Sequence, residues 1–357
     1  MSTVSLNRTE WLDVAKGIAI MLVVIGHSAS FDVSPIYWFH MPAFFMISGY
    51  LFKPQDRIPS LKAWMIKRAK QLFVPYLFFL LLITSLRYLF LLYNSELTFH
   101  SFREDFLDIM IGGRFFPSDF YMVMWFIPCI YLTQVTFAAI HFFIKSNAAR
   151  FAIISLCYVL AHIEAWFLLE NKLNYVPWNL DVALLAIFYY AFGYFVKRVI
   201  IYNQNKRNKL KITMIGILAA AIFITTIYVQ GDYLFNMRSV VYTHFFLDLN
   251  VPITLSILLL ILSWGISKLG HFFGIINYIG RSSLIIMYTH VPIKLVYEHF
   301  FQTNNMMIVI LGIILPLLVS TFILEKSPLL SYLALGRTDT SFPFLTSPVK
   351  KLGFSLK

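Results

Sequence analysis

Charged residues are scarce in this chain: Asp, Glu, Lys and Arg make up only 13% of its 357 residues, whereas 59% are hydrophobic. A soluble domain is about one quarter charged, because its surface must interact with water. The scarcity excludes a single soluble core and favours lipid as the solvent. The net charge of +12 lies in short segments between apolar runs. It therefore predicts orientation in a membrane and no nucleic-acid partner, since no soluble basic domain is left to bind one.

Cysteine is also scarce, and several familiar catalytic motifs are absent. Cys129 and Cys157 both lie inside apolar runs, and neither has a CxxC partner or the spacing of metal ligands. We expect two packing residues, no disulfide framework and no metal. The sequence contains no GxSxG, HEXXH or P-loop motif, which excludes the soluble hydrolase, zinc-protease and nucleotide-binding sites that these motifs build.

Long apolar runs dominate what is present, and they predict an all-α, polytopic membrane helix bundle. A membrane helix needs on the order of 20 mostly apolar residues, and continuous runs argue against a barrel. We expect a membrane-embedded domain over residues 1–325, followed by a cytoplasmic tail over 326–357. The ten expected spans lie at about 13–30, 36–52, 71–93, 120–144, 150–169, 180–201, 212–229, 250–267, 278–299 and 305–324.

Lysine and arginine are distributed unevenly between alternate connections of these spans. The N-terminus, the tail and every second connection hold 23 of them, whereas the other connections hold only four. Because cytoplasmic loops carry the excess of positive charge, both termini are predicted to be cytoplasmic. The outer connection at 94–119 is acidic, and it is long enough to fold over an external opening.

Lys16 and His27 are polar residues inside the first expected span. Their offset of eleven residues corresponds to three helical turns plus about 20°, so both face one side, about 16 Å apart along the axis. Ionisable groups at membrane depth usually serve function, and the flanking Gly17 and Gly26 would allow close helix approach. The ordinary alternative is that Lys16 reaches the headgroups and His27 bonds to a neighbouring helix.

The second expected span carries His40 at its outer entrance and Ser48–Gly49 deep inside it. A polar cap and a small-residue packing face would explain these residues without any catalytic role. The ninth span carries a polar stripe that must face protein or water. The stripe consists of Ser283, His290, Lys294 and Glu298, of which the last two could form a purely structural charge pair.

A basic run, KRAKQLFVPY, precedes the third span at residues 67–76. It can serve topology and contact lipid headgroups, or it can dock a phosphate-rich donor such as coenzyme A. A buried histidine beside a thioester could act as general base for a sugar hydroxyl, while nearby donors steady the oxyanion.

Four segments, in this order, resemble the acyltransferase-3 family of membrane proteins. They are RTEWLDVAKGIAIMLVVIGHS, FHMPAFFMISGYLF, WFIP at Trp125–Pro128, and GRSSLIIMYTH. The opening is most similar to the fucose 4-O-acetylase-like branch. The resemblance implies ten helices in a bacterial inner membrane, acetyl-CoA as the acyl donor, and a polysaccharide or glycolipid acceptor.

The resemblance also implies residue roles. His27 matches the catalytic histidine, and Lys16 matches a basic residue that supports either acyl-donor binding or the electrostatics of the site. Arg68 matches the first position of an Arg-x-x-Arg motif, whose second position is Gln71 here; Lys67 or Lys70 could compensate for that departure. Acyl-donor or substrate binding is expected for the remaining candidates, which are His40, Ser48, Trp125, Ser283, Tyr288 and His290.

Two other classes of function stay open on the sequence. A transporter or flippase of a sugar-linked or small polar solute would also place polar residues at depth, with helices broken near Pro128 or Pro292. A non-catalytic receptor or scaffold would not need Lys16 and His27 on one face. The acceptor sugar, and the choice between acetyl and succinyl, are not encoded in these motifs.

Overall fold

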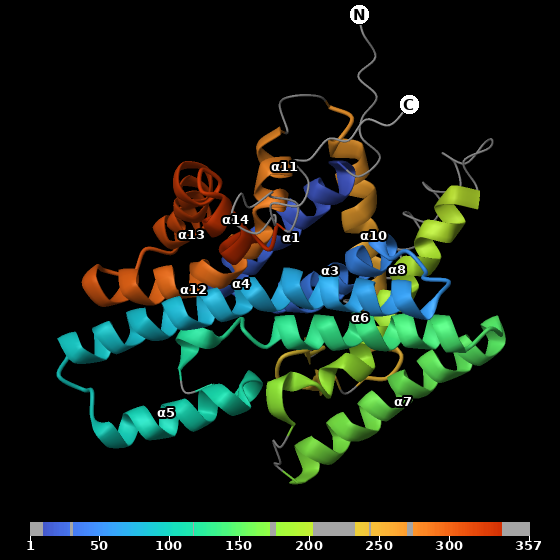
Figure 1. Cartoon of the computed structure of the whole chain (residues 1–357), viewed down its shortest axis with the longest axis horizontal. Coiled ribbons are helices and arrows are strands. Elements are labelled where there is room, and N and C mark those ends of the chain that lie inside the picture. Colours follow the sequence, from blue (N-terminus) through green and yellow to red (C-terminus); the bar gives the residue numbers. More distant parts are fainter. Residues whose placement is uncertain are drawn as a thin grey trace, which may run out of the picture.

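The structure is a computed structural model that describes residues 10–28, 31–116, 118–171, 176–202, 233–242, 244–269 and 274–337. Helices form nearly all of its regular structure (Figure 1). The helices are α1 (Glu10–Ser28), α2 (Ser34–Tyr37), α3 (His40–Leu51), α4 (Ile58–Tyr93), α5 (Phe99–Ile111), α6 (Phe126–Phe143), α7 (Asn147–Asn171), α8 (Val182–Tyr202), α10 (Leu247–Ile266), α11 (Gly274–Arg281), α12 (Ser283–Phe300), α13 (Asn305–Val319) and α14 (Pro328–Leu335).

Short elements connect these helices. The 3-10 turns are η1 (Gly113–Phe115), η2 (Asp119–Tyr121) and η3 (Pro177–Asn179), and a π-helical turn, η5 (Ser320–Leu324), extends α13. Strands β1 (Phe235–Asn236) and β2 (Val241–Tyr242) form a small antiparallel hairpin in which Phe235 pairs with Tyr242. The hairpin is the only sheet among the described residues, so the expected helical class is confirmed.

Seven segments of the described chain are long and apolar enough to cross a membrane. They coincide with the expected spans at 13–30, 71–93, 120–144, 150–169, 180–201, 250–267 and 305–324. The expected span at 212–229 lies outside the described residues. The total of ten spans and the cytoplasmic placement of the termini therefore stay predictions, as does the boundary between a membrane domain and a tail at residue 325.

The two remaining expected spans are interrupted helices. The segment 36–52 consists of α2 and α3, separated at Phe39, where φ is −142°. The segment 278–299 consists of α11 and α12, separated at Ser282, where φ is −95° and ψ is 8°. Both interruptions bring polar side chains to the interior, which fits the rule that irregular backbone at membrane depth is buried in protein or lines a cavity.

Paired glycines allow close approach at two helix crossings. A Cβ on Gly17 would lie 2.2 Å from the carbonyl oxygen of Ile276 in α11, and Gly280 meets α1 in the same way. Gly49 of α3 and Gly193 of α8 form a second reciprocal pair. The expectation that Gly17 allows close approach is thus met, whereas a Cβ on Gly26 would make only ordinary contacts, 3.4 Å or longer.

The connection after α4 folds back as helix α5, and a buried ion pair holds it in place. Arg87, near the end of α4, donates through both terminal nitrogens to the two carboxylate oxygens of Asp105 in α5. An arginine inside a membrane span needs such a partner, because an unpaired charge there is costly. The Arg87–Asp105 pair thereby fixes α5 against the bundle.

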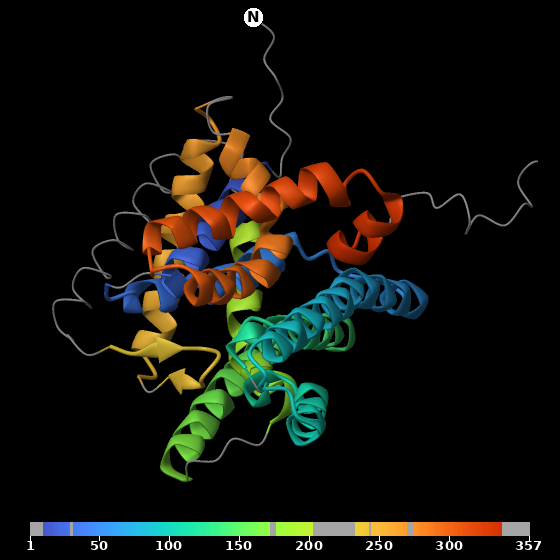
Figure 2. The ribbon, with the colours of Figure 1, turned by 90° about the vertical axis from the view of Figure 1, so that its left-hand side faces the viewer.

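Helix α14 packs against α4, as the view turned by 90° shows (Figure 2). The chain leaves α14 through Gly336, whose φ of +63° suits glycine. A Cβ on Gly336 would lie 2.3 Å from the carbonyl oxygen of Gln71 in α4. The last described turn of the chain therefore touches the α4 turn that follows Arg68.

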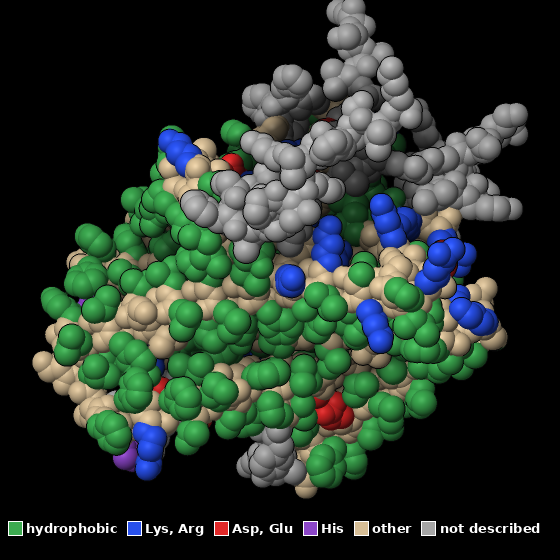
Figure 3. Space-filling view, in the orientation of Figure 1, with side chains coloured by type: hydrophobic (Ala, Val, Ile, Leu, Met, Phe, Trp, Pro, Cys, Tyr) green, Lys and Arg blue, Asp and Glu red, His purple; other side chains and the backbone are tan. Residues whose placement is uncertain are grey.

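Apolar side chains cover most of the surface in the space-filling view, whereas Lys and Arg gather toward one side (Figure 3). Large exposed apolar side chains occur along α4, α7 and α13, among them Leu81, Trp166 and Ile314. So extensive an apolar surface is expected where lipid replaces water. The protein is a multi-pass membrane protein.

Candidate active site

One cavity of about 670 Å³ gathers most of the predicted site residues. Its wall is built by α1, α3, α4, α6, α12 and the β1–β2 hairpin. The predicted residues that line it are Lys16, His27, His40, Ser48, Arg68, Trp125 and Ser283. Residues from sequence positions 16 to 283 thus line one cavity.

His27 sits in the last turn of α1, where its ring meets two aromatic neighbours. Its Nδ1 lies 3.5 Å from the hydroxyl oxygen of Tyr37, and that hydroxyl donates to the carbonyl oxygen of Gly26 at 3.1 Å. The His290 ring lies 5.3 Å away between centroids. Lys294 Nζ donates to the His27 carbonyl oxygen at 2.6 Å, and so satisfies one of the carbonyls that a helix end leaves open.

Backbone carbonyl groups four residues earlier hold His40 and His290 each in one tautomer. His40 Nδ1 lies 2.7 Å from the carbonyl oxygen of Ile36, and His290 Nδ1 lies 2.8 Å from that of Ile286. Since a carbonyl only accepts, Nδ1 must donate in both rings. Each neutral ring therefore keeps Nε2 as an acceptor, and His290 Nε2 is buried without a donor among the described residues.

The opposite end of the cavity is basic. Lys16 pairs with Asp13 at 2.6 Å, and Arg281 lies 3.5 Å from the other oxygen of the same carboxylate. Arg68 Nη1 donates to Gln71 Oε1 at 3.1 Å, so the residue that departs from the Arg-x-x-Arg pattern now orients the arginine. The sequence allowed Lys67 or Lys70 to compensate for Gln71, but neither lines the cavity.

Between these ends lies a hydrogen-bonded pair on facing helices. Gln134 of α6 donates through Nε2 to Ser48 Oγ of α3 at 2.8 Å, and both residues line the cavity. The neighbouring Gly49 makes the tight contact with α8 described above. The Ser48–Gly49 step thus serves helix packing on one side and presents a hydroxyl to the cavity on the other.

Two predicted residues do not line the cavity. Tyr288 is fully buried and stacks on Phe79, with ring centroids 4.6 Å apart. His290 is 2% exposed and lies behind His27. Both residues pack behind the side chains that line the cavity, and direct contact of either residue with a substrate stays a prediction.

Sequence reasoning missed several lining residues, namely Tyr37, Gln134, Asn236 and Arg238. Lys294 was predicted to belong to a polar stripe facing protein or water, with a structural pair to Glu298 as the alternative; its Nζ lies 3.9 Å from the Glu298 carboxylate. The Tyr-x-x-His spacing of Tyr37 and His40 was a usable signal, because it places both rings near one helix entrance. Arg238 lies in a connection with no periodicity, so nothing in the sequence pointed to it.

Metal ligands do not cluster in the described part of the chain: it holds no group of three or more His, Cys, Asp or Glu that could bind an ion. Arg68, Lys16, Arg238 and Lys294 are the charged side chains of the cavity wall, and the described wall contains no carboxylate. The cavity is therefore suited to an anionic ligand with an apolar middle section.

Comparisons with known proteins agree with this picture. Two curated relatives are nodulation proteins NolL: one from Mesorhizobium japonicum, 42% identical over 94 residues, and one from Sinorhizobium fredii, 32% identical over 152 residues. The matches cover 23% and 39% of this chain and only 25% and 39% of the relatives' own lengths. No solved structure matches the chain significantly. The acyltransferase-domain model of the acyltransferase-3 family matches residues 9–325, nearly the whole chain, and the chain therefore belongs to the acyltransferase-3 family of membrane proteins.

Proposed function

We propose that the protein transfers an acyl group, with acetyl expected first, from acyl-CoA to a sugar hydroxyl of a cell-surface or exported polysaccharide or glycolipid. One observation carries the proposal: a single cavity contains a basic end, at Lys16 and Arg68, and a histidine end, at His27. The two ends are about 16 Å apart along α1, which suits a donor whose phosphates and thioester are separated by a long arm. The enzyme is expected in a bacterial inner membrane.

The basic end would hold the coenzyme A phosphates on the cytoplasmic side. Arg68 presents a guanidinium that Gln71 orients from the same helix, and guanidinium groups match phosphate oxygens in pairs. Lys16 adds a second cation, positioned by Asp13. The pantetheine arm would then run past the Ser48–Gln134 pair toward His27.

His27 would act as general base. Tyr37 donates its own proton to Gly26, so its oxygen can accept from His27 Nδ1, which leaves Nε2 to take the proton of the acceptor hydroxyl. The hydroxyl oxygen attacks the thioester carbonyl carbon, the C–S bond breaks, and the thiolate takes the proton back from His27. An ester and free coenzyme A result.

The test is acyl transfer in membranes that contain the wild-type protein or a His27→Ala variant. We expect His27→Ala to abolish transfer from acetyl-CoA while the protein remains inserted, because general-base catalysis typically contributes about 10²–10⁴-fold. The matched control is His299→Ala, since His299 packs on Phe90 away from the cavity and should leave transfer unchanged. Succinyl-CoA in the same assay separates the two acyl groups.

Mass spectrometry of surface glycans supplies the second measurement. Cells with the wild-type gene should carry acyl groups that cells with His27→Ala lack. Transfer retained in His27→Ala would remove His27 from the mechanism. Unchanged glycans, together with altered uptake of a solute, would instead support the transporter alternative.

A further inference from the structure

The β1–β2 hairpin contributes three consecutive residues to the histidine end of the cavity: Asn236, Met237 and Arg238. The tip is tightly turned. Asn236 Oδ1 accepts from the backbone N–H of Ser239 at 3.2 Å, and Val240 has a φ of +55°. A β-branched residue in this conformation is strained and persists only where its surroundings enforce it.

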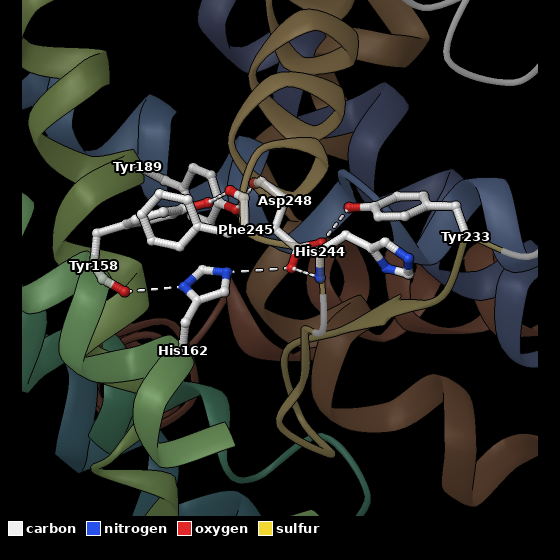
Figure 4. A network of polar contacts seen from close by, with 7 residues as sticks. All are labelled: Tyr158, His162, Tyr189, Tyr233, His244, Phe245 and Asp248. Carbon is white, nitrogen blue, oxygen red and sulfur yellow. Dashed lines mark hydrogen bonds and ion pairs between the residues drawn. The ribbon is translucent and has the colours of Figure 1, made fainter. Parts of the chain in front are cut away.

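A buried carboxylate holds the base of the hairpin (Figure 4). Asp248, in the first turn of α10, is fully buried. Its Oδ1 accepts from the Tyr233 hydroxyl at 2.8 Å, and its Oδ2 accepts from the His244 backbone N–H at 2.9 Å and from His162 Nε2 at 3.2 Å. The Asp248 carboxylate thus joins hydrogen-bond donors from a residue before the hairpin, from a residue after it and from α7.

The tip of the hairpin is held separately from its base. Asn179, which is fully buried between α7 and α8, donates through Nδ2 to the carbonyl oxygen of Arg238 at 2.8 Å. Trp38 packs its ring against Tyr233 at 5.2 Å between centroids. The backbone of Arg238 is therefore fixed, whereas its side chain is left to face the cavity.

The Arg238 guanidinium makes no hydrogen bond or ion pair with any described residue. Its electrostatic neighbours are the exposed Asp119 and the Tyr37 hydroxyl, and burial lowers the pKa of Arg238 below its usual value. A half-buried arginine without a carboxylate partner is unusual, since buried charges are paired. Together with Lys294 it makes the histidine end positive, although the donor phosphates would lie at the far end.

We propose that Arg238 is the acceptor-recognition residue of this cavity, and that the acceptor carries an anionic group, a carboxylate or a phosphate, close to the hydroxyl that becomes acylated. This inference rests on the proposed function and specifies its acceptor class. The guanidinium would bind the anionic group in pairs of hydrogen bonds and hold the neighbouring hydroxyl at His27. Asp248 and Asn179 would act as positioning residues for the hairpin.

The deciding measurement is the location of the acyl groups that wild-type cells have and His27→Ala cells lack. Mass spectrometry should place them on an acidic sugar, or on a sugar that bears or adjoins a phosphate, and mild removal of phosphodiesters distinguishes these two sources. Acyl groups on glycans that contain neither anion would overturn this inference and leave the proposed function intact. No difference between the strains would instead overturn the proposed function.

Variants at Arg238 test the residue itself on the acceptor so identified. Arg238→Gln should raise the acceptor KM at least tenfold with little change in the KM for acyl-CoA, and Arg238→Lys should recover part of the loss. Asp119→Asn removes the competing carboxylate, so it should leave the acceptor KM unchanged or lower it. The melting temperature of each variant in detergent checks folding.

Two outcomes would contradict the role of Arg238. If Arg238→Gln lowered kcat while both KM values stayed the same, the arginine would act on the transition state and not on the acceptor. If Asp119→Asn weakened acceptor binding as much as Arg238→Gln does, the electrostatic basis of the inference would be wrong.

Discussion

Three histidines, His27 and His40 in the cavity wall and His290 behind it, differ in what their ring nitrogens can do. His40 and His290 each use Nδ1 on a carbonyl four residues earlier, which locks their tautomer and leaves only an acceptor. His27 makes no such backbone bond; its described neighbours are the Tyr37 hydroxyl and the His290 ring. His27 is thus the ring whose tautomer is not fixed by a hydrogen bond to its own helix, so either of its nitrogens can serve as the acceptor.

Arg68 allows a test, at the residue scale, of the proposal that the basic end of the cavity binds acyl-CoA. Arg68→Gln should raise the KM for acyl-CoA about tenfold or more, because a hydrogen bond to a charged group contributes about 1.5–3 kcal/mol. The acceptor KM should change little. Initial rates of thiol release at varied acyl-CoA concentration give the measurement.

Lys70→Gln is the matched control for Arg68→Gln. Lys70 lies on the same helix, is exposed and does not line the cavity, so its loss should leave the KM for acyl-CoA near the wild-type value. Equal effects of the two variants would mean that general surface charge, and not the cavity, attracts the donor.

Helical periodicity predicted the site residues that share an element, such as Lys16 and His27, because an offset of eleven fixes their common face. Apart from Gln134, which lies inside α6, the residues it missed come from a very short helix and from the small hairpin. Tyr37 ends a four-residue helix and Arg238 lies at a hairpin tip, where no period relates a residue to the core. Tyr288, in an apolar run, was predicted from the family resemblance, but its ring stacks on Phe79 behind the cavity wall, so its contact with a substrate stays a prediction.

At the scale of elements, composition predicted the uninterrupted helices well and the broken ones poorly. The run 278–299 was expected as one span, but it divides at Ser282 into α11 and α12. The division lies beside Gly280, which packs against the backbone of Asp13 in α1. Only the neighbouring helix makes this geometry favourable, so the sequence of the segment alone could not reveal it.

Helix α4 exceeds the thickness of the membrane. Its 36 residues extend about 54 Å at 1.5 Å per residue, compared with a hydrocarbon core of about 30 Å. The first turns, which hold the basic run, must therefore project beyond the lipid core or the helix must tilt. Arg68, roughly 15 Å from the helix start, then lies near the depth where a water-soluble donor can still reach it.

The crossing of α3 and α8 gives a stability prediction at the element scale. Gly49→Ala should lower the melting temperature in detergent, because the added Cβ would lie 1.9 Å from the carbonyl oxygen of Tyr190 and overpacking costs about 1–3 kcal/mol or more.

Gly265→Ala is the matched control, since nothing described lies within 4 Å of that position. Its melting temperature should stay the same or rise slightly, as alanine favours helix by about 0.5–1 kcal/mol over glycine. If Gly49→Ala and Gly265→Ala had the same melting temperature, α3 and α8 could move apart without loss of stability. The reciprocal glycine crossing would then not hold the bundle together.

At the scale of the whole molecule, the uneven distribution of Lys and Arg predicts which end faces the cytoplasm. In a background without Cys129 and Cys157, a membrane-impermeant maleimide should label Leu97→Cys in intact cells. It should label Lys62→Cys only after permeabilisation. Both positions are exposed and lie near opposite ends of α4. The reverse pattern would invert the proposed path of the donor.

The contact between Gly336 and Gln71 has a consequence for the order of assembly. Helix α4 leaves the ribosome long before α14, so the support behind the Arg68 turn forms well after α4 itself can insert. Until α14 has been synthesised, the Arg68 turn lacks this contact. Under the proposed function, a nascent chain would therefore gain its full affinity for the acyl donor only after α14 has folded onto α4.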